Sequence, residues 1–147
     1  MAGSMLEGLR ARRDELAQEQ VRDLAVPRWE NPKAALKIKP IDHDLIKRQL
    51  GRIEKAKAGA RAAVEVSANA AIIATATTAV VLGEGDGEAV VPLADLAEPL
   101  GLSSDATGAE IIQAFMLTDG DVISCAGAVM KHSGYAQRDL DDELAGE

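Results

Sequence analysis

The longest stretch of the chain without a charged residue comprises VSANAAIIATATTAVVL at residues 66–82 and the following Gly83, and it sets the strongest limit on the fold. A helix that spans a bilayer needs about 20 predominantly apolar residues, whereas this stretch is shorter and contains Ser67, Asn69 and several threonines. We therefore expect no membrane span, and we expect the stretch to be buried in protein. Its small side chains predict a central helix over residues 62–77. One face of that helix comprises Ala68, Ala71, Ile72 and Thr75.

A glycine-rich turn follows this helix. The sequence VVLGEGDGEAVVPL at residues 80–93 places β-branched runs on both sides of the glycines, which is typical of a β-hairpin. The same glycines form a G-x-G-x-G pattern. That pattern is a weak signal for phosphate binding, because it lacks the spacing and the following helix of a dinucleotide loop and contains no lysine. We therefore expect a hairpin here.

The segment VPRWENPKAALKIKPID at residues 26–42 holds the only tryptophan of the chain, Trp29. The residues between Pro32 and Pro40 predict a strand. Because proline cannot donate a hydrogen bond to a sheet, we expect an edge strand that pairs with the VVL or AVV run of the hairpin. The expected sheet comprises residues 34–39, 79–82 and 89–92. Trp29 then either closes one end of a core built from small residues or is exposed as an anchor for a protein partner.

Two charged helices are expected on either side of this segment. The first, a charged N-terminal helix over residues 1–24, has only a thin apolar stripe and therefore needs a partner to be stable. The second begins at Asp42 or Asp44, and its inner positions repeat with a heptad-like spacing. These positions are Ile46, Leu50, Ile53, Lys57 and Ala60. The opposite face is positively charged and comprises Lys47, Arg48, Arg52, Lys55 and Arg61.

This positive face has two interpretations. It is a solvated outer face, which is the common role of such a charge pattern, or it contacts a partner. The candidate partner-binding residues are Trp29, Lys47, Arg48, Arg52 and Lys55.

The last third of the chain is predicted to be helical. Thr107 and Glu110 form a capping box ahead of IIQAFM, and a further helix begins at Asp119 and Asp121 and ends at Ser133 and Gly134. Residues 135–147 are expected to form an acidic flexible tail. The chain is thus predicted to be a mainly helical α+β protein, with a small antiparallel sheet and a hairpin packed on a helical bundle, and one compact domain over residues 25–134. The expected core comprises Ile46, Leu50, Ile53, Ile72, Ile111, Phe115 and Val122.

Charge is distributed unevenly along the chain, whose net charge is −8. Residues 1–61 hold 14 Lys and Arg against 9 Asp and Glu, which gives +5, whereas residues 62–147 hold 2 against 15, which gives −13. A basic half and an acidic half favour association with oppositely charged surfaces, including head-to-tail contacts between copies of the chain. Two solvated faces that serve solubility explain the same distribution.

The residues of common catalytic and metal sites are sparse. The two histidines, His43 and His132, belong to different segments, and neither a catalytic triad nor an H-E-x-x-H pattern is present. Asp42 and Asp44 beside His43 are better explained by helix capping than by a metal. The lone Cys125 lies in an apolar run, which indicates a buried cysteine of a cytosolic protein. The N-terminus has no apolar core of signal-peptide length, so we expect no export. We expect neither an enzyme nor a cofactor.

Nucleic-acid binding is also not expected. Aromatic residues make up only 2% of the chain, so a stacking platform for bases has few side chains to use. No recognition module is visible, and the overall charge is acidic. Salt-sensitive binding of DNA by the segment from Lys47 to Arg61 would contradict this expectation.

The order of elements resembles a known family. The chain is similar to the tail assembly chaperones of long-tailed actinobacterial phages in the order of its segments. A charged N-terminal helix is followed by LAVPRWENPKAALKIKPID and by a helix from about Asp44. Then come AAIIATATTAVVLGEGDGEAVVPL, GAEIIQAFMLTDGDVISCAGAVMKHSG and an acidic end. The resemblance covers residues 20–145, and Lys131 and His132 stand where the family pattern has an aromatic residue before Ser133. It implies a non-enzymatic protein of the host cytoplasm that binds the tape-measure protein while tail tube subunits assemble. The alternative is a head-tail connector or tail component that stays in the virion.

Overall fold

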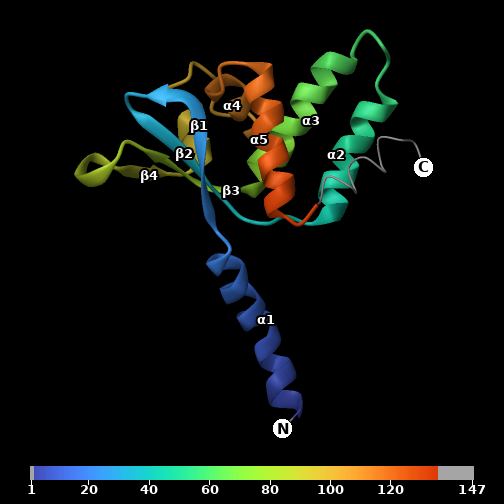
Figure 1. The fold of residues 1–147 in the computed structure, drawn as a ribbon, viewed down its shortest axis with the longest axis vertical. Helices are drawn as coiled ribbons and strands as arrows, with labels where there is room; N and C mark the ends of the chain where they lie inside the picture. The colour runs from blue at the N-terminus through green and yellow to red at the C-terminus, as the bar shows by residue number, and fades with distance from the viewer. Residues whose placement is uncertain (1, 136–147) are drawn as a thin grey trace.

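The chain folds as a mainly helical α+β protein, as the sequence predicts. The computed structural model describes residues 2–135. The helices are α1 (Ala2–Glu19), α2 (His43–Lys55), α3 (Arg61–Ala76), α4 (Gly108–Phe115) and α5 (Asp119–His132). The strands are β1 (Arg22–Glu30), β2 (Lys33–Ile38), β3 (Thr77–Leu82) and β4 (Ala89–Val91), with 3₁₀ turns η1 (Gly85–Gly87) and η2 (Leu93–Leu96) on either side of β4. Figure 1 shows the sheet beside the group formed by α2 to α5, with α1 extending away from the body.

The four strands form one antiparallel sheet in the order β1-β2-β3-β4. The predicted pairing of β2 with the VVL run is confirmed, because Leu36 pairs with Val80 and Ala35 with Val81. The prediction that β2 is an edge strand is wrong, because β2 also pairs with β1 along its other side. Pro32 and Pro40 lie just outside the strand, so they remove no hydrogen bond from its ladders.

Strand β1 is the main difference from the sequence prediction. The helix expected over residues 1–24 ends at Glu19, and residues 22–24 already belong to β1. The alternation of buried and exposed residues that marks a strand is interrupted, because Pro27 lies within β1 and the pairing with β2 shifts register between Ala25 and Glu30. Between these two pairs β1 advances five residues and β2 only two, so the irregularity adds three residues to β1 and hides the period of two in the sequence. Proline in β1 is compatible with its position at the edge of the sheet.

The predicted hairpin is confirmed by β3 and β4. Val80, Val81 and Leu82 pair with Val91, Val90 and Ala89, and η1 forms the turn between the two strands. Gly83 has a φ of 84°, and a Cβ at this position would lie 2.8 Å from the backbone oxygen of Gly87. The turn therefore requires glycine at position 83.

Helix α3 is the centre of the helical group, as expected for the longest uncharged stretch. It packs against α2, α4 and α5 and continues directly into β3. The approach of α4 to α3 is close, since a Cβ at Gly108 would lie 2.8 Å from the Cβ of Ala74. Thr75, expected on the packed face, is exposed instead. The seven predicted core residues are all buried in one cluster: Ile46, Leu50, Ile53, Ile72, Ile111, Phe115 and Val122.

The ends of the helices agree in part with the predictions. Both hydrogen bonds of the capping box between Thr107 and Glu110 are present at the start of α4. Helix α5 begins at Asp119 as expected, with the Thr118 hydroxyl accepting a hydrogen bond from the Asp121 amide. Helix α2 ends at Lys55, so the last two positions of the heptad-like seam, Lys57 and Ala60, lie in the connection to α3.

The acidic tail expected over residues 135–147 lies outside the described residues except for its first member. Tyr135 is buried, and its ring meets that of His43 edge to face with centroids 5.3 Å apart. The packed body therefore extends to Tyr135.

Candidate protein-binding surfaces

The outward side of α2 carries the positive face that the sequence predicts. Ile46, Leu50 and Ile53 anchor the helix in the core. At about 100° per residue, Arg48 and Lys55 point almost directly away from that core, with Lys47 and Arg52 on either side of them. All four cations are exposed, and we call Lys47, Arg48, Arg52 and Lys55 the α2 basic face. Arg61, the fifth predicted member, is exposed at the first position of α3.

Among residues 2–135, no ion pair joins the α2 basic face to a carboxylate, although Asp44 lies on the same outward side of the helix, one turn before Arg48. Arg52 donates hydrogen bonds to the Gln49 side chain at 2.6 Å and to the Ser67 hydroxyl at 3.2 Å, both of which are neutral groups. Across residues 2–135, the ion pairs link other cations, Arg12, Arg28, Lys33 and Lys37, to carboxylates. A surface of this kind offers positive charge to an acidic partner without first breaking internal salt bridges.

Trp29, the other candidate residue, is partly buried at the end of β1. Its ring packs on Phe115 with centroids 4.9 Å apart, and its indole N–H donates a hydrogen bond of 2.9 Å to the Phe115 carbonyl. This carbonyl belongs to the last residue of α4, where helical carbonyls lack an intrahelical partner. Trp29 therefore joins β1 to the end of α4. Strand β1, which carries Trp29, lies apart from α2 in the fold (Figure 1), so the candidate residues do not form a single site.

Arg28, beside Trp29, forms a contact that the sequence did not indicate. It has a φ of 74°, which is unusual for a residue other than glycine, and its Nε donates a 2.8 Å hydrogen bond to the Asp121 carboxylate in the first turn of α5. The hydrogen bond from Arg28 lowers the pKa of Asp121 below its ordinary value, against the opposing effect of desolvation. The positive φ at the β1 bulge and the ion pair together fix the end of β1 against α5.

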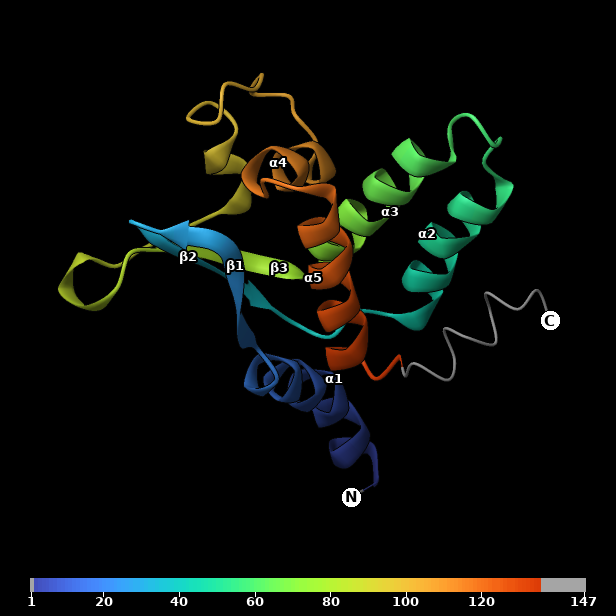
Figure 2. The same cartoon turned by 45° about the horizontal axis from the view of Figure 1, so that its top comes forward.

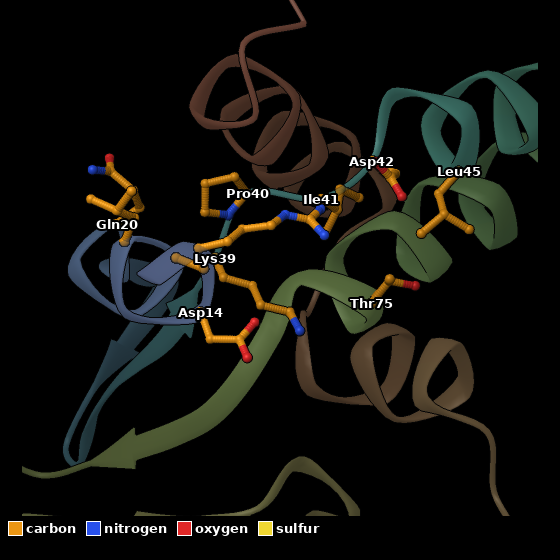
Figure 3. Close-up of a pocket in the computed structure, with 11 residues that line it drawn as sticks. Asp14, Gln20, Lys39, Pro40, Ile41, Asp42, Leu45 and Thr75 are labelled. Atoms are coloured by element: carbon orange, nitrogen blue, oxygen red, sulfur yellow. The ribbon is translucent and has the colours of Figure 1, made fainter. Parts of the chain in front are cut away.

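An open groove of 590 Å³ lies between the end of α1 and the body. Figure 3 shows its lining, with Asp14 and Gln20 on the α1 side and the segment from Lys39 to Asp42, Leu45 and Thr75 on the other side. Leu16, Ala17, Pro40, Ile41 and Leu45 make part of its wall apolar. Arg13 and Lys39 stand with Asp14 and Asp42, so the charge of the lining is mixed and does not favour a small anion or cation.

The two histidines hold the ends of elements together. The ring Nε2 of His43 lies 2.9 Å from the Ser133 carbonyl, and that of His132 lies 2.6 Å from the Gln20 carbonyl. Cys125 is buried, and this burial raises the pKa of its thiol. Residues 2–135 contain no group of three or more His, Cys, Asp or Glu side chains arranged to hold a metal ion.

Comparison of the chain with known protein families, with curated proteins and with solved structures gives no match. Among the described residues, no helix is both long enough and apolar enough to cross a membrane.

Proposed function

We propose that this chain is a non-enzymatic phage tail assembly chaperone that binds the tape-measure protein while the tail tube protein assembles around it in the host cytoplasm. The resemblance of the sequence motivates the proposal, and the α2 basic face is the observation that carries it. A long helical client with acidic stripes would lie along α2. The four cations would orient the client and speed the encounter, as complementary charge does at protein interfaces.

The construction of α2 supports a binding role. A helix anchored through Ile46, Leu50 and Ile53 on the central helix α3 holds its outer side chains on a rigid support. Rigid placement reduces the ordering cost of binding, which is one of the main terms opposed to association. The same helix has an Asp42 N-cap without a side-chain capping bond, so the interior packing is the main source of its stability.

The test is copurification from cells that express the full chain together with its tape-measure protein. In the test variant, Arg48→Glu and Lys55→Glu reverse two cations of the α2 basic face. In the control variant, Lys33→Glu and Lys131→Glu change the net charge by the same amount at exposed positions outside that face. We expect the test variant to lose at least about tenfold of the retained client, because removing charge pairs and adding like charges costs more than about 1.4 kcal/mol. Equal retention by both variants, or no retention by the unaltered chain, would overturn the proposal.

A second candidate function is a structural component of the virion, such as a head-tail connector. The exposed apolar residues of α1 favour it, because permanent assemblies bury such residues between subunits. Quantitative mass spectrometry of purified particles separates the two functions. A chaperone should be absent from the particles, whereas a connector should be present at a fixed number of copies per particle.

A further inference from the structure

The described part of the chain ends against the first turn of α2. The Ser133 carbonyl lies 2.9 Å from Nε2 of His43, and the Ser133 hydroxyl accepts a hydrogen bond of 3.0 Å from the Ile41 amide. Tyr135 is buried and packs its ring on His43. Figures 1 and 2 both show the C-terminal end of α5 beside the start of α2. Residues 136–147 are therefore attached at the N-terminal end of the helix that carries the α2 basic face.

The two segments that meet at this point carry opposite charges. Residues 136–147, AQRDLDDELAGE, hold five Asp and Glu against one Arg, which gives −4. Residues 42–61, which comprise α2 and its flanks, hold six Lys and Arg against three Asp and Glu, which gives +3. The ion pairs within residues 2–135 use none of the four cations of the α2 basic face. Cations without a carboxylate partner in the described fold thus lie beside the attachment of an acidic segment.

The order of the charges favours contact between the two segments. After Tyr135, Arg138 is the first charged residue, so it lies closest along the chain to the start of α2, where Asp44 stands. At about 100° per residue, Glu54 lies about 100° around the helix from Lys55 and therefore away from the outward side. Four of the acidic residues follow Arg138 in a short run: Asp139, Asp141, Asp142 and Glu143.

Residues 136–147 are long enough to reach all four cations. At about 1.5 Å per residue, Lys47 lies about 6 Å and Lys55 about 18 Å from His43 along the axis of α2. An extended chain spans up to about 3.3 Å per residue, so Glu143 can lie about 26 Å from Tyr135. The difference leaves length for the path from the flank of α2, where His43 lies, to the outward side. Because the tether is short, the effective concentration of the segment is high, and weak ion pairs suffice to hold it.

We propose that residues 136–147 dock on the α2 basic face of the same chain and cover it until an acidic partner displaces them. The carboxylates of the segment occupy the cations that the carboxylates of a client would use. The docking itself does not depend on the proposed function. The regulation of client binding that follows from it rests on that function.

Paramagnetic NMR on the full chain, without any client, measures the docking. A spin label is attached to Ala145→Cys, and Cys125 stays unlabelled because it is buried. At low salt, the amide signals from Arg52 to Lys55, at the far end of α2, should lose most of their intensity. The loss should be much smaller near 1 M salt, where the Debye length is about 3 Å. It should be equally small in a neutralised chain that carries Asp139→Asn, Asp141→Asn, Asp142→Asn and Glu143→Gln.

A matched pair of charge reversals identifies the surface. Arg48→Glu with Lys55→Glu reverses two cations of the α2 basic face and should abolish most of the intensity loss. Arg10→Glu with Lys33→Glu makes the same change of net charge at exposed positions on α1 and β2, and it should preserve the loss.

Three results would overturn the proposal. The first is no intensity loss in the unaltered chain at low salt. The second is a loss of equal size in the neutralised chain or in the α2 variant, which would show a tether without docking. The third comes from a mixture of isotope-labelled chains without a spin label and spin-labelled chains without isotope. A loss of equal size in this mixture would place the segment on a neighbouring copy.

The consequence for client binding is measured with the neutralised chain and the tape-measure protein. The neutralised chain should bind this client with a Kd lower by at least about twofold, because a face that is covered most of the time is available for less than half of it. Equal Kd values, with docking observed by NMR, would refute the competition between the segment and the client. The NMR experiment contains no client, so its failure would overturn the docking and leave the proposed function to its own test.

Discussion

At the scale of single residues, the most informative contacts join positions far apart in the sequence. Arg28 reaches Asp121 and Trp29 reaches Phe115, so two adjacent residues of β1 hold both α4 and α5. The sequence predicted that Trp29 closes a core or anchors a partner, and its packing on Phe115 supports the first of these roles. The Arg28 contact was not predictable, because a positive φ at arginine leaves no mark in the residue pattern.

Substitutions at Arg28 should separate backbone strain from the ion pair. Both Arg28→Ala and Arg28→Gly remove the ion pair with Asp121, but only glycine adopts a φ of 74° without strain. We expect the glycine variant to be more stable than the alanine variant by about 1 to 2 kcal/mol. Chemical denaturation of the two proteins measures this difference. If the alanine variant is the more stable, the β1 bulge does not keep its left-handed conformation in solution.

Core substitutions test the packing around α3. Leu50 is 8% exposed and Ile72 is 1% exposed, so replacing either by alanine should cost about 2 to 5 kcal/mol of unfolding free energy. Leu117→Ala, at a side chain that is 63% exposed, should change the same quantity by less than about 0.5 kcal/mol. Urea unfolding curves with equal slopes would give all three values. Losses below about 0.5 kcal/mol at both core positions would contradict this packing.

At the scale of elements, the sequence predicted what depends on local chemistry. The glycine turn indicated the β3–β4 hairpin, the uncharged run indicated α3, and Thr107 with Glu110 indicated the start of α4. Strand β1 was not predicted, because Pro27 and the register shift after Ala25 conceal its alternation. The interior position of β2 was also not predictable from Pro32 and Pro40, since the pattern does not show whether a proline lies inside or just outside a strand.

The hairpin turn gives a prediction at the same scale. Gly83→Ala should destabilise the protein by about 1 kcal/mol or more, because φ is 84° and the added Cβ would meet the Gly87 carbonyl at 2.8 Å. Gly87→Ala is the matched control in the same turn, since a Cβ at Gly87 meets no atom within 4 Å. Thermal unfolding of both variants measures the contrast. Equal stability would mean that the turn does not hold this geometry.

The first turns of α4 and α5 make stability depend on pH. Hydrogen bonds from Thr107 lower the pKa of Glu110, and the hydrogen bond from Arg28 lowers the pKa of Asp121. A carboxyl group whose pKa is lower in the folded than in the unfolded chain stabilises the folded protein at any pH above the unfolded pKa, which is about 3.9 to 4.3. This stabilisation is lost as the pH falls through the pKa of the folded state. Asp121→Asn should therefore reduce the loss of melting temperature between about pH 6 and pH 3. A variant whose melting temperature falls as steeply as that of the unaltered protein would show that Asp121 makes no such contribution.

At the scale of the whole molecule, the two charged halves of the sequence do not become two ends of the fold. Strand β2 pairs with β3 and α2 packs on α3, so segments from before and after residue 61 lie side by side. Head-to-tail association by charge stays a prediction. Helix α1, whose Met5, Leu6, Leu9 and Leu16 are exposed, projects from the body, and it lies apart from α2, which carries the α2 basic face (Figure 2).

Lysine acetylation footprinting measures whether the proposed client binds to the α2 basic face. The full chain is labelled alone and in complex with its tape-measure protein, and the modification of each lysine is measured by mass spectrometry. Labelling of Lys47 and Lys55 should fall in the complex, whereas labelling of the exposed Lys33 and Lys131 in the same molecules should stay constant. Unchanged labelling of Lys47 and Lys55 in a saturated complex would contradict binding of the client at the α2 basic face.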